Sequence, residues 1–460
     1  MAGTNEAAGE IADAPAGASL PALALGLGAF LTQFDVTAVI VALPAIGRDL
    51  GFGTAGYAWV MDAYSLVFTG TLLAAGALAD RCGRRRALLA GNLVFLAASL
   101  ACGLAGNGPW LWLARGAQGF GAAFVVTGAI ALVSTVYPGA RERARAFGLV
   151  GVVSGIAMAA GPSLGGLIAG TLGWRWIFLV NIPLCLLIAA AVPRLVPEAR
   201  AGGERSIDAL GIVLLTLALG ALIEALLHLC EHPAWAVGGV AACLAAGALF
   251  VVRQRRCRHP VLDPAVFARP AMAAVAGLLV ALSVSYWAVL VYLPMFLRAA
   301  FGWGDDTVGL ALLAATLPML VLPARGGPLA AAWGFRRFFA GALAVTGAGA
   351  LVLAAAAGGA GSASLVLAGM VLLGVGAALA HPQLSGAVVA LAPPEQAGMA
   401  SAVTVVMRQG GFALGIALLG ATLGPAPSLE AFAWLFGLGA MGAAAGIAAA
   451  GCLEPKPAGG

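Results

Sequence analysis

The distribution of apolar residues constrains the fold of this chain more than any other feature. Apolar stretches of roughly 20 residues, the length that a transmembrane helix needs, follow one another from residue 22 to residue 452. Of the 460 residues, 62% are hydrophobic and 9% are charged, whereas a soluble domain carries about 25% charged residues. A water-soluble fold cannot cover so much apolar surface. The sequence therefore predicts an all-α membrane protein.

Fourteen such segments are separated by short polar or Gly/Pro-rich connections, and we expect each to be a transmembrane helix. They lie near residues 22–44, 57–79, 87–106, 109–135, 146–170, 174–194, 208–229, 235–252, 271–297, 307–324, 337–357, 363–391, 398–422 and 429–452. Disordered cytoplasmic tails are expected at 1–20 and 453–460. The first of these lacks the basic start of a cleaved signal peptide.

The basic residues predict the orientation of the chain. With fourteen spans both termini lie on one side, and most of the 24 Lys and Arg residues fall in connections on that side, including Arg84–Arg86, Arg141–Arg145 and Arg253–Arg258. Basic residues are retained in cytoplasmic loops. We therefore expect a multi-pass protein whose termini are both cytoplasmic.

An internal repeat divides the chain into two halves. Gly76–Arg86 reads GALADRCGRRR and Gly327–Arg337 reads GPLAAAWGFRR, after the second and the tenth expected span. The second copy has Ala331 where the first has Asp80. We expect an N-terminal six-helix bundle at 21–195, two inserted transmembrane helices with their linkers at 196–270, and a C-terminal six-helix bundle at 271–452. A substrate site between two such repeats lies near the midplane of the membrane.

Three motifs carry a resemblance to a known family. Gly76–Arg86 closely resembles the loop signature G-x-L-a-D-r-x-G-r-r of the major facilitator superfamily, and Ala114–Ala123, which reads ARGAQGFGAA, resembles its fourth-helix signature. Gly161–Gly166, which reads GPSLGG, resembles the G-x-x-x-G-P-x-x-G-G signature of exporters, with Ala157 in place of the first glycine. Among such transporters this last motif marks antiporters.

Two further stretches narrow the resemblance. The chain resembles the fourteen-helix drug:proton antiporter family in three segments, Trp174–Pro183, Phe34–Thr37 and Ala42–Pro44. Within that family, the segment Trp59–Leu66 looks most like the branch that exports quaternary ammonium compounds and cationic dyes. The resemblance covers residues 22–452. It implies a major facilitator fold in the bacterial inner membrane and proton-coupled multidrug efflux.

Two sets of residues are expected to act as gates. In the loop motif Gly76 and Gly83 allow a tight turn, Asp80 can pair with an arginine or a helix N-terminus, and Arg84 and Arg85 hold the loop at the cytoplasmic side. In the exporter motif Pro162 bends its helix. The neighbouring glycines, Gly161, Gly165 and Gly166, let another helix approach closely.

Proton coupling requires an acid that can become neutral inside the membrane. Asp35 lies about 14 Å from the outer end of its span at 1.5 Å per residue, and we expect it to be the main proton site. Asp62 either shares the coupling or attracts a cationic substrate, or it is an interfacial acid near water. Arg115 is expected to pair with these acids, although snorkelling to the interface is an alternative. Glu224 is a further candidate, on a span expected at the periphery.

The substrate cavity is expected to include Asp35, Asp62, Gln118, Arg408 and His381. Arg408 would pair with a carboxylate across the interface or bind an anionic group of a substrate, and His381 would titrate or simply pack. The second bundle has no deep acid, which disfavours multivalent cations. Hydrophobic monovalent cations or neutral amphiphiles fit better.

Other classes of protein are disfavoured. The seven cysteines and four histidines show no metal-ligand spacing, no GxxxxGK[ST] motif is present, and no Ser/His/Asp set lies at one depth. We expect no enzyme, no cofactor, no metal and no nucleic-acid partner, and we expect a monomer that meets its substrate, protons and lipid. Alternatives left open are a dedicated exporter of an endogenous metabolite, an importer and an uncoupled facilitator.

Overall fold

The computed structural model describes residues 19–137, 139–199, 208–227, 233–257, 270–391, 397–423 and 427–453, and every regular element in these ranges is a helix. Ten of the described helices are long and apolar enough to cross a membrane, or eleven if one bent pair forms a single span. The prediction of an all-α membrane protein is confirmed, while the count of fourteen spans stays a prediction. The expected tails, most of the linkers around the inserted pair, and the connection at 392–396 lie outside the described residues.

The first group of helices follows the expected spans closely. It consists of α2 (Leu20–Leu50), α3 (Thr54–Cys82), α4 (Arg84–Gly103), α5 (Gly108–Val136), α6 (Ala140–Thr171), α7 (Arg175–Leu179) and α8 (Asn181–Leu195). The expected span at 174–194 corresponds to α7 and α8 together. Glycines permit the close pairing of these helices: a Cβ on Gly121 of α5 would lie 2.6 Å from the carbonyl oxygen of Gly91 in α4.

The second group contains more bends. It consists of α12 (Pro270–Leu282), η2 (Ser283–Ala288), α13 (Val289–Phe301), α14 (Asp305–Thr316), α15 (Pro318–Val321), α16 (Pro323–Trp333), α17 (Phe335–Ala355), η3 (Ala356–Ala360), α18 (Ala363–Leu391), α19 (Ala397–Gly420) and α20 (Leu429–Gly451). The chain bends by 66° between Asp305–Val321 and Arg325–Trp333, because Pro318 and Pro323 interrupt the helix hydrogen bonds.

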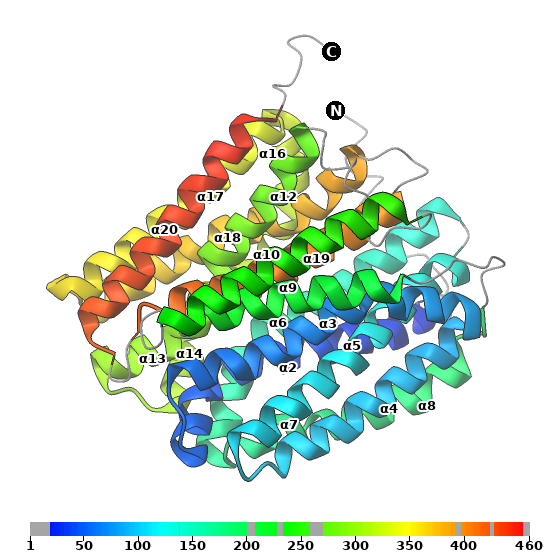
Figure 1. The fold of residues 1–460 in the computed structure, drawn as a ribbon, viewed down its shortest axis with the longest axis horizontal. Helices are drawn as coiled ribbons and strands as arrows, with labels where there is room; N and C mark the ends of the chain where they lie inside the picture. The colour runs from blue at the N-terminus through cyan, green and yellow to red at the C-terminus, as the bar shows by residue number, and fades with distance from the viewer. Residues whose placement is uncertain are drawn as a thin grey trace, which may run out of the picture.

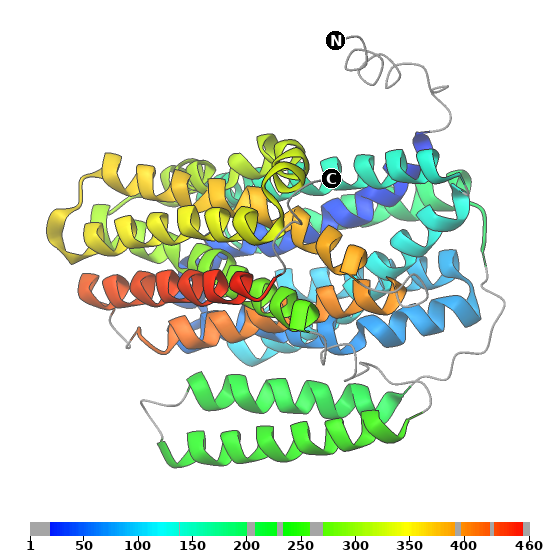
Figure 2. The same cartoon turned by 90° about the horizontal axis from the view of Figure 1, so that it is seen from above.

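The inserted pair, α9 (Ala209–Leu227) and α10 (Pro233–Arg256), lies beside the other helices (Figures 1 and 2). In Figure 2 the two green helices form a separate layer along one side. Their ends are tied together by Asp208, whose carboxylate accepts hydrogen bonds from Arg253 Nε (3.0 Å) and Gln254 Nε2 (2.8 Å). Within the described residues, α9 packs against both groups, through α3 and α19.

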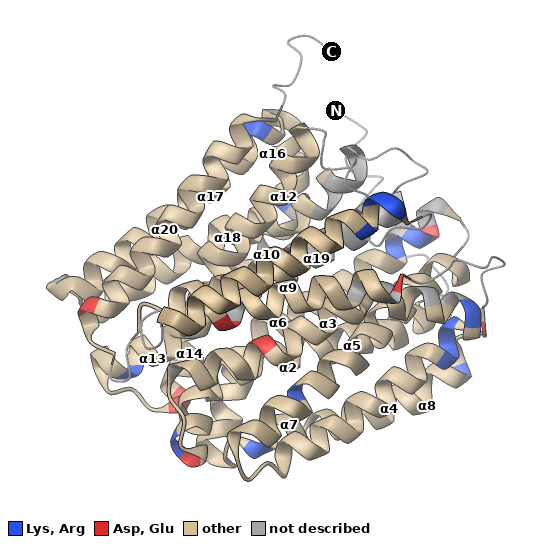
Figure 3. Ribbon diagram, in the orientation of Figure 1, with Lys and Arg blue, Asp and Glu red and all other residues tan. Residues whose placement is uncertain are grey.

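Charged residues gather at the helix ends and are sparse along the middle of the bundle (Figure 3). We call the end where α4 begins, at Arg84–Arg86, and where α10 ends, at Arg253–Arg256, the basic end. Large apolar side chains such as Leu93, Leu113 and Leu244 are exposed around the sides, as expected of a surface that faces lipid. This distribution fits a multi-pass membrane protein.

Candidate functional site

A buried ion pair joins the first and fourth expected spans. Asp35 of α2 and Arg115 of α5 are both fully buried, and Arg115 Nη1 donates to Asp35 Oδ2 at 2.5 Å. A buried arginine is costly unless it is paired. Arg115 therefore does not snorkel to the surface, and the two residues that the sequence singled out for coupling lie in contact.

The second oxygen of Asp35 is also satisfied. Asp35 Oδ1 accepts hydrogen bonds from Asn181 Nδ2 of α8 (2.7 Å) and from Gln118 Nε2 of α5 (3.2 Å). Gln118 Nε2 also donates to Ser99 Oγ of α4 (2.8 Å), and Gln118 Oε1 accepts from Arg115 Nη1 (2.8 Å). This network, hereafter the Asp35 cluster, connects α2, α4, α5 and α8.

Aromatic rings and a backbone carbonyl enclose the guanidinium. Arg115 Nε donates to the Val60 carbonyl oxygen of α3 (3.0 Å), while the Arg115 Cζ atom lies 4.6 Å from the ring centroid of Tyr64 and 5.8 Å from that of Phe178. Cation–π contacts of this kind strengthen when water is excluded. Because Arg115 also contacts α3 and, through Phe178, α7, a change in the charge of Asp35 would affect six helices: α2, α3, α4, α5, α7 and α8.

Asp62 lies outside the Asp35 cluster, on α3. Its side chain is fully buried, and neither carboxylate oxygen has a hydrogen-bond partner among the described residues. Ser65 and Thr69 lie on the same helix face, at i+3 and i+7, and their buried hydroxyls are likewise without partners in the described part of the chain. Leu66, four residues after Asp62 on α3, packs against Ala413 and Ala417 of α19. The stripe of Asp62, Ser65 and Thr69 is thus a buried polar surface beside the second group of helices.

The remaining candidates for proton coupling and for the substrate cavity are dispersed. Glu224 is half-buried on α9. His381 of α18 is half-buried with its ring 5.6 Å from that of Trp287, and Arg408 is half-buried on α19. The structure therefore brings Asp35, Arg115 and Gln118 together, while His381 and Arg408 belong to the second group of helices.

The loop motif forms a turn between α3 and α4 at the basic end. Gly83 adopts φ +105°, which favours glycine, and a Cβ there would meet the carboxylate of Glu198. Glu198 accepts hydrogen bonds from the backbone N–H groups of Arg85 (3.0 Å) and Arg86 (3.3 Å) at the N-terminus of α4. The carboxylate therefore complements the positive end of the helix dipole.

The other loop-motif residues differ in their surroundings. Arg85 Nη1 donates to the Val196 carbonyl oxygen (3.0 Å), and Arg84 Nη1 donates to that of Ala131 (3.1 Å). A Cβ on Gly76 would meet no atom within 4 Å. Asp80 belongs to the last turn of α3, and its side chain lies outside the described part of the structure.

The glycines of the exporter motif contact two other helices. Gly161 and Gly165 of α6 pack on Thr37 and Ala38 of α2, where no Cβ would fit. Gly166 instead faces α14: a Cβ there would lie 2.5 Å from the Asp305 carbonyl oxygen and 2.8 Å from Gly309 Cα. One helix with small residues on two faces thus joins the two groups of helices.

A hydrogen bond and the burial pattern support this joint. Next to Pro162, which lies inside α6, Ser163 Oγ donates to the Gly309 carbonyl oxygen (2.9 Å). Toward the basic end of the same helix, a Cβ on Gly148 or Gly151 would meet nothing within 4 Å. Among the described residues, the close contacts of α6 with the second group therefore lie at the end away from the basic end.

Three residues of these networks were not singled out from the sequence. Asn181 lies within the quoted Trp174–Pro183 stretch, and a polar amide inside an apolar span is itself a signal. Ser99 carries no comparable signal, because serine is common between close helices. Glu198 follows the sixth expected span, and only the fold shows that it reaches the start of α4.

Comparisons with known proteins agree with this architecture. The model of the Major Facilitator Superfamily matches residues 25–253 and 273–459. The multidrug resistance protein Stp of Mycobacterium tuberculosis is 34% identical over 407 residues, which are 88% of this chain and 75% of that protein. The cephamycin export protein CmcT of Amycolatopsis lactamdurans is 32% identical over 408 residues, covering 85% and 82%.

A solved structure supports the fold alone. The crystal structure of a peptide transporter POT in complex with sulfate superposes with a TM-score of 0.67 at 16% identity, and the match covers 93% of each chain.

Proposed function

Because this chain belongs to the Major Facilitator Superfamily and is a transporter rather than an enzyme, we propose that it is a proton-coupled antiporter that exports hydrophobic compounds, either monovalent cations or neutral amphiphiles. Export is supported by the names of its relatives, which include a multidrug resistance protein, a cephamycin export protein and a puromycin resistance protein. In this proposal the basic end faces the cytoplasm, and the two groups of helices rock about the site between them.

The Asp35 cluster carries the proposal of proton coupling. The groups that hydrogen-bond to the Asp35 carboxylate, from Arg115, Asn181 and Gln118, are all donors. A protonated carboxyl has an O–H that needs an acceptor, and it no longer balances the charge of Arg115. Protonation of Asp35 therefore requires the cluster to rearrange, and the helices that it joins would move with it.

Asp62 is the proposed site for a cationic group of the substrate. A carboxylate that is fully buried without hydrogen bonds is unfavourable as an anion, so it needs either a proton or an external cation. The stripe of Asp62, Ser65 and Thr69 has the unused acceptors for such a group. Arg115 would couple substrate binding at Asp62 to proton binding at Asp35. It pairs with Asp35, and its Nε donates a hydrogen bond to the carbonyl oxygen of Val60, two residues before Asp62.

The two motifs are the proposed gates. In this proposal the contact of Gly166 with α14 closes the transport path on the side away from the cytoplasm. The turn at Gly83, with Arg84 and Arg85, forms the gate on the cytoplasmic side. Glu198 and the helix N-terminus that it caps would move as one unit with the first bundle.

The experiment uses the full chain in liposomes that contain a trapped pH-sensitive dye. A proton gradient is imposed, and lipophilic cations and neutral amphiphiles are added to wild type and Asp35→Asn. Substrate-triggered proton movement that disappears in the variant supports the proposal. A matched control is Asp49→Asn, because Asp49 pairs with Arg175 at 2.7 Å on the exposed surface and should leave coupling intact. Transport without proton movement in wild type would refute antiport and support an uncoupled facilitator.

A dedicated exporter of one anionic metabolite is the second candidate. It is favoured by the half-buried cationic side chain of Arg408 on α19 of the second group, and by the similarity to a cephamycin export protein. Transport of organic anions that is lost in Arg408→Gln, with lipophilic cations inactive, would establish this candidate in place of the first.

A further inference from the structure

Asn181, the first residue of α8, has a fully buried side chain whose two polar atoms are used unequally. Asn181 Nδ2 donates to Asp35 Oδ1 at 2.7 Å, whereas Asn181 Oδ1 has no hydrogen-bond partner among the described residues. A buried carbonyl oxygen without a donor is unfavourable. The amide is therefore only half-satisfied in this arrangement, in which every group that touches Asp35 is a donor.

A proton on Asp35 needs an acceptor within reach. Three side chains contact the carboxylate, and one of them, Arg115, carries donors only. In the second, Gln118 Oε1 already accepts from Arg115 Nη1 (2.8 Å) and from Cys102 Sγ (3.3 Å), so both of its lone pairs are engaged. The third, Asn181, brings a carbonyl oxygen that no other group in the described part of the chain uses.

We propose that Asn181 is a positioning residue for proton coupling, whose amide turns over when Asp35 takes up a proton so that Asn181 Oδ1 accepts the new O–H. The inference rests on the proposed role of Asp35 as the proton site. The proton is then bound to Asp35 Oδ1, and Asp35 Oδ2 becomes the carbonyl oxygen of a neutral acid. The rotation is accessible because the terminal torsion of asparagine is broad and roughly two-fold. One outer atom of the amide lacks a partner in either orientation, so that cost changes little.

The rotation determines which helix contact is weakened by proton uptake. The hydrogen bond between α2 and α8 persists in both states, with its direction reversed. The contact with Arg115 of α5 instead loses its charge attraction, because a neutral acid does not balance a guanidinium. Proton uptake should therefore loosen α5 from α2 while α8 stays attached.

The pH dependence of Asn181 should follow the protonation of Asp35. Apart from Arg115, the titratable groups beside the cluster are thiols and a phenol, which are mostly neutral at pH 7 at their ordinary pKa values. They are Tyr64 of α3, Cys102 of α4 and Cys185 of α8, one turn after Asn181. On α2 and the described helices packed against it, every other charged residue except Asp62 lies within two turns of a helix end.

The test records infrared difference spectra between high and low pH on the full chain in lipid nanodiscs, with ¹³C at the side-chain carbonyl of asparagine. Assignment is simple because the chain has four asparagines, Asn5, Asn92, Asn107 and Asn181. Protonation of Asp35 gives a carboxyl band that is absent in Asp35→Asn. As that band appears, the Asn181 carbonyl band, identified by its loss in Asn181→Leu, should move to lower wavenumber because its oxygen becomes an acceptor.

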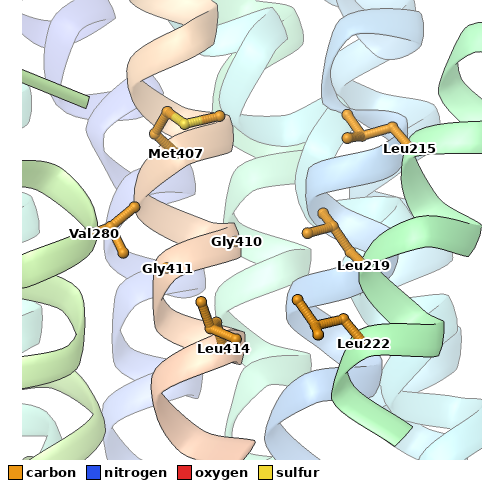
Figure 4. Close-up of a pocket in the computed structure, with 8 residues that line it drawn as sticks. All are labelled: Leu215, Leu219, Leu222, Val280, Met407, Gly410, Gly411 and Leu414. Carbon is orange, nitrogen blue, oxygen red and sulfur yellow. The ribbon is translucent and has the colours of Figure 1, made fainter. Parts of the chain in front are cut away.

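Asn92 of α4 is the matched control. It is also buried, its Nδ2 donates to the Cys185 carbonyl oxygen (2.9 Å), and its Oδ1 lacks a partner among the described residues. No hydrogen bond in that part of the chain joins it to Asp35, so its band should not move with pH. A second control is Gly410→Ala. Gly410 lies on α19 in the apolar groove beside the leucines of α9 (Figure 4), and α19 contributes no residue to the Asp35 cluster.

Transport gives a second readout in the liposome assay. Asn181→Leu should slow substrate-triggered proton movement by roughly tenfold, because the acid O–H is left buried without an acceptor. Asn181→Ser should restore part of the rate, since a hydroxyl can both donate and accept. Asn92→Leu and Gly410→Ala should stay within about twofold of wild type, as expected for substitutions outside the network.

The outcomes separate this inference from the proposed function. An Asn181 band that stays in place while the Asp35 carboxyl band appears overturns the role of Asn181 and leaves Asp35 as the proton site. Equal slowing in Asn92→Leu and Asn181→Leu also overturns it, because the effect would then be structural. Substrate-driven proton movement with no Asp35 carboxyl band at any pH refutes both. If Asn181→Leu does not fold, Asn181→Ser assigns the same band.

Discussion

Replacement of Gly166 by alanine should separate the two groups of helices at the end away from the basic end. The added Cβ would lie 2.5 Å from the Asp305 carbonyl oxygen and 2.8 Å from Gly309 Cα, whereas ordinary Cβ contacts begin at 3.4 Å. Both neighbours are backbone atoms, so no side-chain rotation can relieve the overlap. α6 and α14 must therefore move apart by roughly the difference between these distances.

The expected magnitude follows from the cost of overpacking. One inserted methyl group in a close-packed contact costs about 1–3 kcal/mol. If the cost falls only on the state in which α6 and α14 touch, the equilibrium shifts toward the opposite state by roughly 5–150-fold. Gly151→Ala is the matched control on the same helix, because a Cβ there would meet nothing within 4 Å.

The assay is a distance distribution between spin labels at Thr171→Cys and Thr307→Cys, two exposed positions on α6 and α14, in a background without other cysteines. Gly166→Ala should populate a longer distance, and Gly151→Ala should reproduce wild type. Identical distributions for Gly166→Ala and wild type, or an equal change in the control, would show that this contact does not hold the two groups together.

Three further predictions concern charged groups. Arg115→Gln should lower the free energy of unfolding by about 3–5 kcal/mol, because it leaves the buried charge of Asp35 unpaired. Denaturant unfolding of the double variant with Asp35→Asn should show part of that loss recovered. Additive losses in the two single variants and the double variant would contradict the pairing. Asp208→Asn should destabilise the inserted pair at neutral pH: burial alone would raise the pKa of Asp208, but the hydrogen bonds from Gly211, Arg253 and Gln254 outweigh it and hold the pKa below its ordinary value. The stabilisation is therefore present above about pH 4, the unfolded value, and is lost as the pH falls through the lowered folded pKa. Thermal unfolding from pH 7 to pH 3 should show the difference from wild type shrink as the pH falls below about 4, and a constant difference would refute the ionic contribution. Glu198→Gln should lower thermal stability by about 0.5–2 kcal/mol and expose the start of α4 to hydrogen exchange, with Glu430→Gln in the first turn of α20 as a comparison that leaves α4 unchanged.

The sequence by itself determined the class of the protein and most of its helices. Span length and hydropathy are local properties, because the bilayer requires each span to satisfy its own backbone hydrogen bonds. The same constraint identified Asp35, Arg115 and Gln118, since polar groups inside apolar spans are rare and normally have partners. The glycine motifs likewise indicated close helix contacts.

Only the tertiary structure decided which helices those contacts join. Spans that are apolar on every side have no periodic pattern to show which face is inside, and lipid competes with protein for apolar side chains without preferring either. The sequence therefore could not show that Asn181 completes the Asp35 cluster, or that Gly165 faces α2 while its neighbour Gly166 faces α14. These relationships depend on the rotation and packing of helices that are far apart in the chain.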